Sequence, residues 1–381
     1  MSTAVDSRRL DDAEALPAAD PGEMLRQVAS SAAQIREARL VSGEAGLERL
    51  AEDGRPRAVV VTGMGGSGIS GDVLAAVCGT GCPVPIVTVR GYRLPGWVGA
   101  ADLVIAVSCS GGTEETLSVA HEAMRRGCRM LFVGGVDSPL ADLAVQARAP
   151  FVPVRSVGQP RSTLWGLSIP LILAARTLGL ANVPDEVLEG AAHRLEDVAH
   201  RCRPASESFV NPAKRIALDL AGDLPMAWGT SDLATTAAYR LCCQLNENAK
   251  YPGVFGGLPE VDHNQVVAFD GLFAGARSGP GDVDDFFRDR ADDREGSSLH
   301  LVVLRDTDEH PQVRKRREVS VELASARGVA VTEIAAEDGH PLERIAGLIA
   351  MADYVTVYLA IALGVDPTPV TAIQELKARI A

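Results

Sequence analysis

A glycine-rich turn, Gly63-Met64-Gly65-Gly66-Ser67-Gly68, follows a short apolar run and precedes an apolar helical pattern. Such a turn at a helix start presents free backbone N–H groups, which favour an anion or a sugar as ligand. The same residues match the dinucleotide fingerprint, but that site also needs an acid after the second strand, where the sequence is Val89-Arg90-Gly91. An NADP-binding variant through Arg90, or a turn without a ligand, is an alternative that the sequence favours less.

A second polar turn, Ser108-Cys109-Ser110-Gly111-Gly112-Thr113-Glu114-Glu115-Thr116, follows the apolar run 103–107. One of its hydroxyls could cap the helix that starts there. A cap accounts for one hydroxyl and leaves the others unexplained. Several hydroxyls and free N–H groups together form a neutral site for a phosphate, which a dinucleotide site does not need. This turn therefore favours a sugar phosphate over a dinucleotide.

Three further residues could take part in chemistry. Arg161 lies near a predicted helix start and could neutralise negative charge that develops on a substrate oxygen. Glu247 ends a predicted helix, and His263 lies in a polar segment before an apolar run. Each has an ordinary alternative: a surface arginine, a solvated glutamate and a hydrogen-bonded structural histidine. A carboxylate and a neutral histidine are also the groups that move protons in acid–base catalysis.

The elements that would position these residues form two α/β halves. Short apolar runs alternate with helical patterns in the first half, which predicts a parallel, doubly wound sheet. Right-handed crossovers then bring the turns after the strands to one end of the sheet. The predicted strands are 58–62, 85–89, 103–107, 130–133 and 151–154 in the first half, and 226–228, 266–269, 299–304 and 329–334 in the second.

The fold class is therefore α/β, with two doubly wound domains whose mainly parallel sheets are flanked by helices. The segment from 164 to 222 is nearly all helical and contains the predicted domain border. Helices are also expected at 343–363 and 371–380. The predicted division is a flexible N-terminal tail at 1–20, an N-terminal domain at 21–183 and a C-terminal domain at 184–381, with a polar surface insert at 271–298.

The composition excludes several classes of protein. The 381 residues carry a net charge of −13, which argues against a nucleic-acid or anionic-membrane surface. The seven cysteines fit no zinc spacing, so we expect no metal and a reducing compartment. No apolar run approaches the about 20 residues of a membrane helix. We therefore expect a cytoplasmic protein without a nucleic-acid or membrane partner.

Taken together, the motifs resemble the sugar isomerase (SIS) domain proteins, and more closely the bifunctional phosphoglucose/phosphomannose isomerase family. The sequence departs from the usual family pattern at Cys109, where relatives commonly carry an aromatic residue, and at Gly112, where they carry Asn. The resemblance runs from about Pro21 to the C-terminus and rests on segments 63–68, 108–116, 160–162, 246–248, 259–264 and 364–369.

The resemblance implies a role for each matching residue. Glu247 would move a proton between C1 and C2, His263 would open the sugar ring, and Arg161 would stabilise the enediolate. It also implies a homodimer with shared active sites, in which the neighbour contributes the histidine, and it implies no cofactor. The implied phosphate ligands are Gly66, Ser67, Ser108, Ser110 and Thr113, with further substrate contacts from Gly65 and Lys377.

The sequence thus predicts an aldose–ketose isomerase that interconverts glucose 6-phosphate or mannose 6-phosphate with fructose 6-phosphate. The main alternative is a non-catalytic sugar-phosphate-binding protein, either a sensor or a decayed relative. That alternative would retain the hydroxyl turns and lose the acid and the base, whereas Glu247 and His263 are both present. A nicotinamide oxidoreductase is the third alternative.

Overall fold

The computed structural model describes residues 8–12, 14–156, 158–274 and 297–380. The chain divides into two compact units. The N-terminal unit comprises Arg26–Asp197 and Gly339–Ala346, and the C-terminal unit comprises the described residues of Met1–Leu25, Val198–Asp338 and Gly347–Ala381.

The border between the units differs from the predicted border at 183/184, because it falls inside α9 (Asp185–Arg201). Most of α9 packs with the N-terminal unit. Arg36 of α4 (Ser31–Gly43) forms salt bridges with Glu189 and Glu196 of α9, which holds these two helices together.

The sheet of the N-terminal unit has five parallel strands in the order β2-β1-β3-β4-β5. All five strands agree with the sequence prediction to within one residue at each end, which confirms the parallel fold class for this unit. Two of the inner strands, β1 and β3, are buried along their whole length, as apolar parallel strands must be. The strands are β1 (Val59–Thr62), β2 (Ile86–Val89), β3 (Leu103–Ser108), β4 (Arg129–Gly134) and β5 (Phe151–Pro153).

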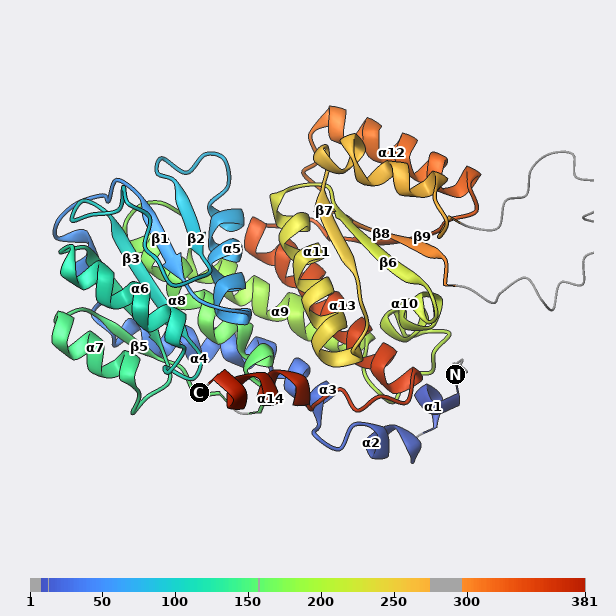
Figure 1. Ribbon diagram of the computed structural model, residues 1–381, viewed down its shortest axis with the longest axis horizontal. Coiled ribbons are helices and arrows are strands. Elements are labelled where there is room, and N and C mark those ends of the chain that lie inside the picture. Colours follow the sequence, from blue (N-terminus) through green and yellow to red (C-terminus); the bar gives the residue numbers. More distant parts are fainter. Residues whose placement is uncertain (1–7, 13, 157, 275–296, 381) are drawn as a thin grey trace, which may run out of the picture. The chain divides into compact units, whose positions relative to one another are not determined.

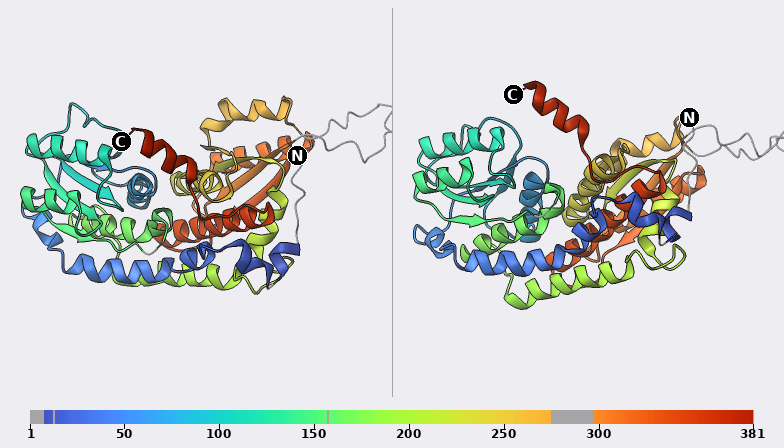
Figure 2. Two further views of the ribbon diagram at one scale, coloured as in Figure 1. Left: turned by 60° about the horizontal axis from the view of Figure 1, so that its bottom comes forward. Right: turned by 90° about the horizontal axis from the view of Figure 1, so that it is seen from below.

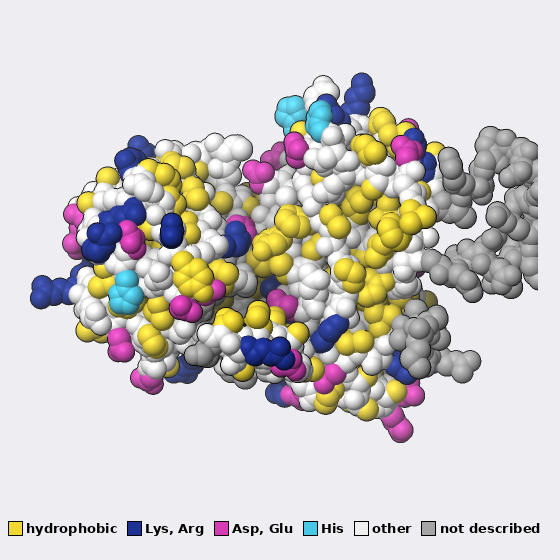
Figure 3. Space-filling view, viewed as in Figure 1, with side chains coloured by type: hydrophobic (Ala, Val, Ile, Leu, Met, Phe, Trp, Pro, Cys, Tyr) yellow, Lys and Arg dark blue, Asp and Glu magenta, His cyan; other side chains and the backbone are white. Residues whose placement is uncertain are grey.

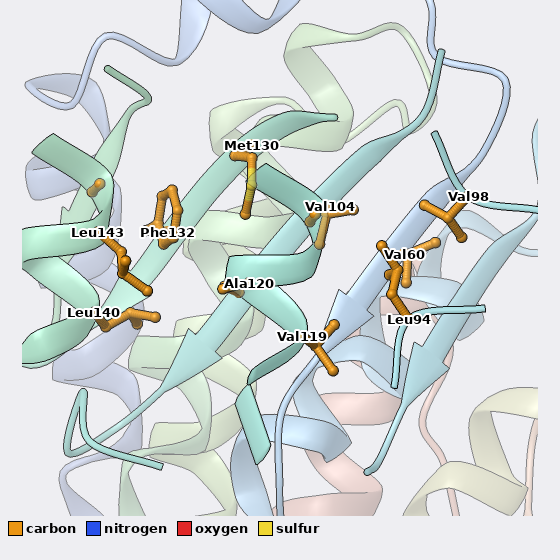
Figure 4. Close-up of a cluster of buried hydrophobic side chains, with 13 residues drawn as sticks. Val60, Leu94, Val98, Val104, Val119, Ala120, Met130, Phe132, Leu140 and Leu143 are labelled. Atoms are coloured by element: carbon orange, nitrogen blue, oxygen red, sulfur yellow. The ribbon is translucent and has the colours of Figure 1, made fainter. Parts of the chain in front are cut away.

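Helices cover both faces of this sheet. α6 and α7 lie on one face in Figure 1, and Figure 4 shows the core beneath them, where Val104 and Phe132 of the strands meet Ala120 and Leu140 of the helices. The other face carries α5, where a Cβ at Gly71 would lie 2.9 Å from Val61. The remaining elements of this unit, besides α4 and α9, are η1 (Leu47–Ala51), α5 (Gly66–Cys78), α6 (Glu114–Arg125), α7 (Pro139–Ala147), η2 (Pro160–Thr163) and α8 (Leu164–Thr177), and α3 (Met24–Ala29) crosses the border between the units.

The sheet of the C-terminal unit has four parallel strands in the order β7-β6-β8-β9. They are β6 (Leu224–Gly229), β7 (Val254–Gly257), β8 (Leu299–Arg305) and β9 (Ala330–Ala335). The sequence predicted β6, β8 and β9, but the predicted strand 266–269 is wrong. Those residues form the 3₁₀ helix η5 (Gln265–Asp270), which packs Phe269 against Trp228 with ring centroids 5.5 Å apart.

The missed strand, β7, lies at the edge of its sheet. Hydrophobic side chains are exposed over the region of β7 and α11 in Figure 3, and Val254 and Phe255 are 53% and 40% exposed. Two of its four residues are glycines, Gly256 and Gly257, which seldom occur inside strands. An exposed, glycine-rich edge strand therefore lacks the pattern by which a strand is predicted.

The C-terminal helix α14 (Thr371–Ile380) begins and ends where the sequence predicted a helix, and all of its residues are exposed. Figure 2 shows it as a separate helix at the end of the C-terminal unit. The other helices of this unit are α1 (Arg8–Asp11), α2 (Ala15–Ala19), α10 (Pro212–Leu220), α11 (Asp232–Gln244), η3 (Leu245–Ala249), η4 (Glu260–His263) and α12 (Pro311–Ala326).

The long helix α13 (Pro341–Ala362) begins in the N-terminal unit and continues in the C-terminal unit. This helix of 22 residues is long and apolar enough to cross a membrane by length and composition, which corrects the expectation that no apolar run approaches that length. Within its most apolar window, 89% of the residues are buried inside the protein, so α13 has the character of a core helix.

The described residues of the predicted flexible tail, 8–12 and 14–20, include the helices α1 and α2. The side chain of Leu10 is completely buried, and the ammonium group of Lys214 donates hydrogen bonds to the carbonyls of Leu10, Pro204 and Ser206. The buried Leu10 side chain and these hydrogen bonds therefore order a segment whose sequence is rich in charged residues. Most of the predicted insert at 271–298 lies outside the described residues.

Candidate active site

The glycine-rich turn connects β1 to the first turn of α5. Gly65 has φ +54, and a Cβ at Gly68 would lie 2.8 Å from the carbonyl oxygen of Gly63. The turn therefore needs glycine at these positions, since a side chain would clash or strain the backbone. Ser67, in the first turn of α5, is only 6% exposed. The turn can thus present the N–H groups at the start of α5 to a ligand.

The second turn connects β3 to α6. The hydroxyl of Ser108 lies 2.8 Å from the hydroxyl of Thr113, and the N–H of Thr113 donates to Ser108 Oγ over 3.4 Å. Thr113 occupies the N-cap position, but its side chain accepts no capping bond from α6. The capping alternative therefore does not explain this hydroxyl. Ser110 is exposed, and its Oγ accepts a hydrogen bond from the N–H of Gly112 over 3.3 Å.

The two turns lie next to each other at the carboxyl end of the sheet. Their strands pair in parallel, with Thr62 of β1 opposite Ala106 of β3. The N–H of Cys109 donates to Ser67 Oγ over 3.4 Å, which joins the second turn to the first. The sequence predicted this juxtaposition from the positions of the strand ends.

The Cys109 side chain connects the second turn to η2. Burial raises the pKa of the Cys109 thiol, which also interacts with Ser156 and Thr163. A raised pKa keeps the thiol neutral at ordinary pH, so Cys109 adds no negative charge beside an anion.

Arg161 lies in η2 and is only 4% exposed. Its Nη1 donates to Oε1 of Gln159 over 3.1 Å. A Cβ at Gly66 would lie 3.9 Å from the Cα of Arg161, so the backbone of η2 passes close to the start of α5. A third loop therefore joins the two turns, and within it the Arg161 guanidinium is held by Gln159.

The structure also bears on the dinucleotide alternative. Arg90 follows β2 and forms a salt bridge with Asp72 of α5. The guanidinium that would have to bind a 2′-phosphate is thus already paired with a carboxylate.

Glu247, His263 and Lys377 lie in the C-terminal unit. Glu247 is half-buried in η3, a π-helical turn that extends α11. His263 is exposed at the end of η4, and Lys377 is exposed on α14.

The residue before His263 anchors its segment. Asp262 Oδ1 accepts a hydrogen bond from Ser320 Oγ over 2.9 Å, and Asp262 Oδ2 lies 3.5 Å from Nη1 of Arg316. Both partners belong to α12, so η4 is tied to that helix. Nothing in the sequence pairs Asp262 with a residue almost 60 positions later, so this anchor could not be predicted.

The structure thus brings one group of predicted residues together at the carboxyl end of the N-terminal sheet: Gly65, Gly66, Ser67, Ser108, Ser110, Thr113 and Arg161. The second group, Glu247, His263 and Lys377, belongs to the other unit. Among the residues that the structure describes, no cluster of three or more His, Cys, Asp and Glu side chains could hold a metal ion.

Comparisons with known proteins identify relatives of this chain. A sequence profile of the family described as "Bacterial phospho-glucose isomerase C-terminal SIS domain" matches residues 209–380. A bifunctional phosphoglucose/phosphomannose isomerase of Caldicellulosiruptor bescii is 32% identical over 323 residues, which cover 85% of this chain and 89% of that protein. The Aquifex aeolicus protein of the same name is 30% identical, with 87% and 92% covered.

A solved structure supports the same fold. The C-terminal domain of glucosamine-fructose-6-phosphate aminotransferase from Francisella tularensis superimposes with a TM-score of 0.62 and 13% identity, covering 91% of this chain and 97% of that one. At this identity the likeness concerns the fold alone. Because two relatives are at least 30% identical over most of both sequences, the chain belongs to the bifunctional phosphoglucose/phosphomannose isomerase family.

Proposed function

We propose that this protein interconverts glucose 6-phosphate and mannose 6-phosphate with fructose 6-phosphate through an enediolate. The observation that carries the proposal is the juxtaposition of two hydroxyl-bearing turns, joined by the hydrogen bond from the Cys109 N–H to Ser67 Oγ. Membership of a family named for phosphoglucose and phosphomannose isomerases supports the choice of substrates.

The two turns would bind the phosphate. Ser67, Ser108, Ser110 and Thr113 supply hydroxyls, and the first turns of α5 and α6 supply N–H groups with the positive ends of their helix dipoles. Gly65 and Gly66 have no side chain, so the ligand could approach the backbone of α5 closely. Such local groups would hold an anion despite the net charge of −13.

The chemistry would need one proton to move between neighbouring carbons. Glu247 would remove the proton from C2 of the aldose and return it to C1, so that one C–H bond breaks and another forms without a redox partner. Arg161 would stabilise the negative charge of the enediolate. His263 would open the sugar ring, and Lys377 would contact the substrate.

The proposal includes a homodimer that shares its active sites, with the partner supplying the histidine. The exposure of His263 supports this part, because an exposed side chain is accessible to a second subunit. We also propose a cytoplasmic location, which the seven cysteines support, since all of them are free thiols in the structure.

A coupled assay with both aldose phosphates tests the function. The purified protein, in the oligomeric state that it has in solution, is incubated with glucose 6-phosphate or mannose 6-phosphate. The fructose 6-phosphate formed is then measured. The proposal predicts that both are converted. Thermal stabilisation by these phosphates without turnover of either would contradict it and would indicate the non-catalytic alternative.

A further inference from the structure

Three polar side chains form a buried stripe along α11 and η3. Arg240, Gln244 and Asn248 follow each other at intervals of four residues, and each is at most 1% exposed. This spacing places them on one face of the helix. Residues of these types are seldom fully buried unless they are paired. The stripe ends at Asn248, the immediate neighbour of Glu247.

The stripe is hydrogen-bonded to α13. Nε and Nη2 of Arg240 donate to the two carboxylate oxygens of Asp353 over 2.9 and 3.0 Å. Thr356, one turn further along α13, donates from Oγ1 to the carbonyl of Asp353 over 2.9 Å. The same Oγ1 lies 3.0 Å from Nδ2 of Asn248 and accepts a hydrogen bond from it. Thr356 is completely buried, so it links α13 to the residue beside Glu247.

The turn that carries Glu247 is also held by Lys250. The backbone N–H of Lys250 donates to the carbonyl of Leu245, which closes a π-helical turn. Nζ of Lys250 donates to the carbonyls of Glu247, Asn248 and Asp366 over 3.2, 3.1 and 2.7 Å. π-helical turns are rare and occur often at functional sites. Hydrogen bonds to Thr356 and from Lys250 therefore maintain an unusual turn.

We propose that Thr356 is a positioning residue for Glu247: its hydroxyl holds Asn248 in the core and thereby fixes the direction of the Glu247 carboxylate. This inference rests on the proposed function, in which Glu247 is the base. Asn248 and Glu247 share one turn of backbone, so a rotation that withdraws Asn248 also displaces the carboxylate. A displacement of about 1 Å at a catalytic group lowers a rate by up to about 100-fold.

A matched pair of variants tests the role of the hydroxyl. Thr356→Val keeps the shape of the side chain and removes Oγ1, whereas Thr356→Ser keeps the hydroxyl and removes a methyl group. We expect Thr356→Val to lower kcat about 10-fold with KM changed less than about twofold, because the hydroxyl acts on the carboxylate and on no phosphate ligand. We expect Thr356→Ser to retain a kcat close to that of the unchanged protein.

Thr332→Val is the control for loss of a hydroxyl elsewhere in the same unit. Thr332 Oγ1 lies 2.8 Å from Nε2 of His300 on β8 and β9, away from η3. This variant should keep its kcat even where its melting temperature falls. If Thr356→Val does not fold, Asn248→Leu replaces it, because it removes the amide that donates to Thr356 Oγ1. This variant should also lose kcat with little change in KM.

The outcomes separate the two hypotheses. If the unchanged protein converts none of the hexose phosphates, the proposed function fails. Suppose instead that the unchanged protein is active and Glu247→Gln is inactive. A full kcat in folded Thr356→Val then overturns the positioning role alone, and so does a full kcat in Asn248→Leu where that variant replaces it. Equal losses of kcat in Thr356→Val and Thr356→Ser would also overturn it, because packing and not the hydroxyl would then be responsible.

Discussion

The hydroxyl of Ser108 lies 2.8 Å from the hydroxyl of Thr113 across the loop between β3 and α6. Ser108 is completely buried at the end of its strand, whereas Thr113 is half-buried at the start of the helix. The pair therefore holds the loop closed and keeps a hydroxyl at the helix start that no cap uses. In the proposed phosphate site, these two hydroxyls are in direct hydrogen-bonding contact.

Replacement of Ser108 by Ala should weaken substrate binding. The variant loses one hydroxyl and the partner of Thr113, and a hydrogen bond to a charged group contributes about 1.5–3 kcal/mol. We expect KM for fructose 6-phosphate to rise about 10-fold or more. Steady-state kinetics measure the change. Ser118→Ala is the control. It removes from α6 a hydroxyl that donates to the carbonyl of Tyr92, and it should leave KM unchanged.

The glycine pair in the same loop should respond unequally to substitution. Gly111 has φ +69, and a Cβ there would clash with the side chain of Ser138, so Gly111→Ala must displace the cap of α7. We expect a loss of about 1–3 kcal/mol in the free energy of unfolding. A Cβ at Gly112 would meet nothing within 4 Å, so Gly112→Ala should be tolerated.

Thermal unfolding of the two alanine variants measures this difference. Gly112→Asn, which restores the residue common in relatives, should likewise keep the melting temperature and KM close to those of the unchanged protein. An equal fall in melting temperature for Gly111→Ala and Gly112→Ala would show that the loop does not have the backbone described here.

The stability of the N-terminal unit should depend on the ionisation of His340. Nδ1 of His340 accepts a hydrogen bond from the N–H of Leu342 over 3.1 Å, and Nε2 lies 3.1 Å from the carbonyl of Asn182. Burial lowers the pKa of His340 from 6.5, although the carboxylate of Glu343 opposes the shift. Below pH 6.5 the unfolded chain therefore binds a proton that the folded chain resists, and stability falls as the pH falls.

Denaturant unfolding between about pH 7.5 and about pH 5.5 tests this sign. His340→Asn keeps an acceptor at the helix start but cannot titrate, so the variant should lose less stability over this interval than the unchanged protein. His121→Asn, at an exposed position on α6, is the control and should behave as the unchanged protein does. The same pH dependence in His340→Asn would assign the effect to another group.

The parallel strands of the N-terminal unit could be predicted because their sequences are short, mostly apolar runs that end at polar residues, proline or glycine. The run 266–269 misled the prediction, because four apolar residues have no periodicity that separates a strand from a 3₁₀ turn. The structure of this run depends on a tertiary contact, the packing of Phe269 against Trp228, which the local sequence does not reveal. β7 escaped prediction because its pairing with β6, and not its own composition, makes it a strand.

The position of the two proposed phosphate-binding turns could be predicted for a similar reason, since residues that follow neighbouring parallel strands must meet at one end of the sheet. The surroundings of Glu247 could not be predicted from the sequence. A π-helical turn has no sequence signature, and Thr356 is more than 100 positions away from its partner Asn248. The spacing of Arg240, Gln244 and Asn248 was a visible signal, because polar residues at four-residue intervals mark a polar face on a helix.

Proton exchange measures the central claim most directly. Fructose 6-phosphate is incubated with the protein in heavy water, and deuterium at C2 of the aldose product is followed by NMR, with Glu247→Gln as the matched variant. The account predicts that deuterium enters C2 with the unchanged protein and that Glu247→Gln slows this incorporation by about 100-fold or more. Incorporation at an undiminished rate in Glu247→Gln would contradict it, because the proton would then be moved by a different base.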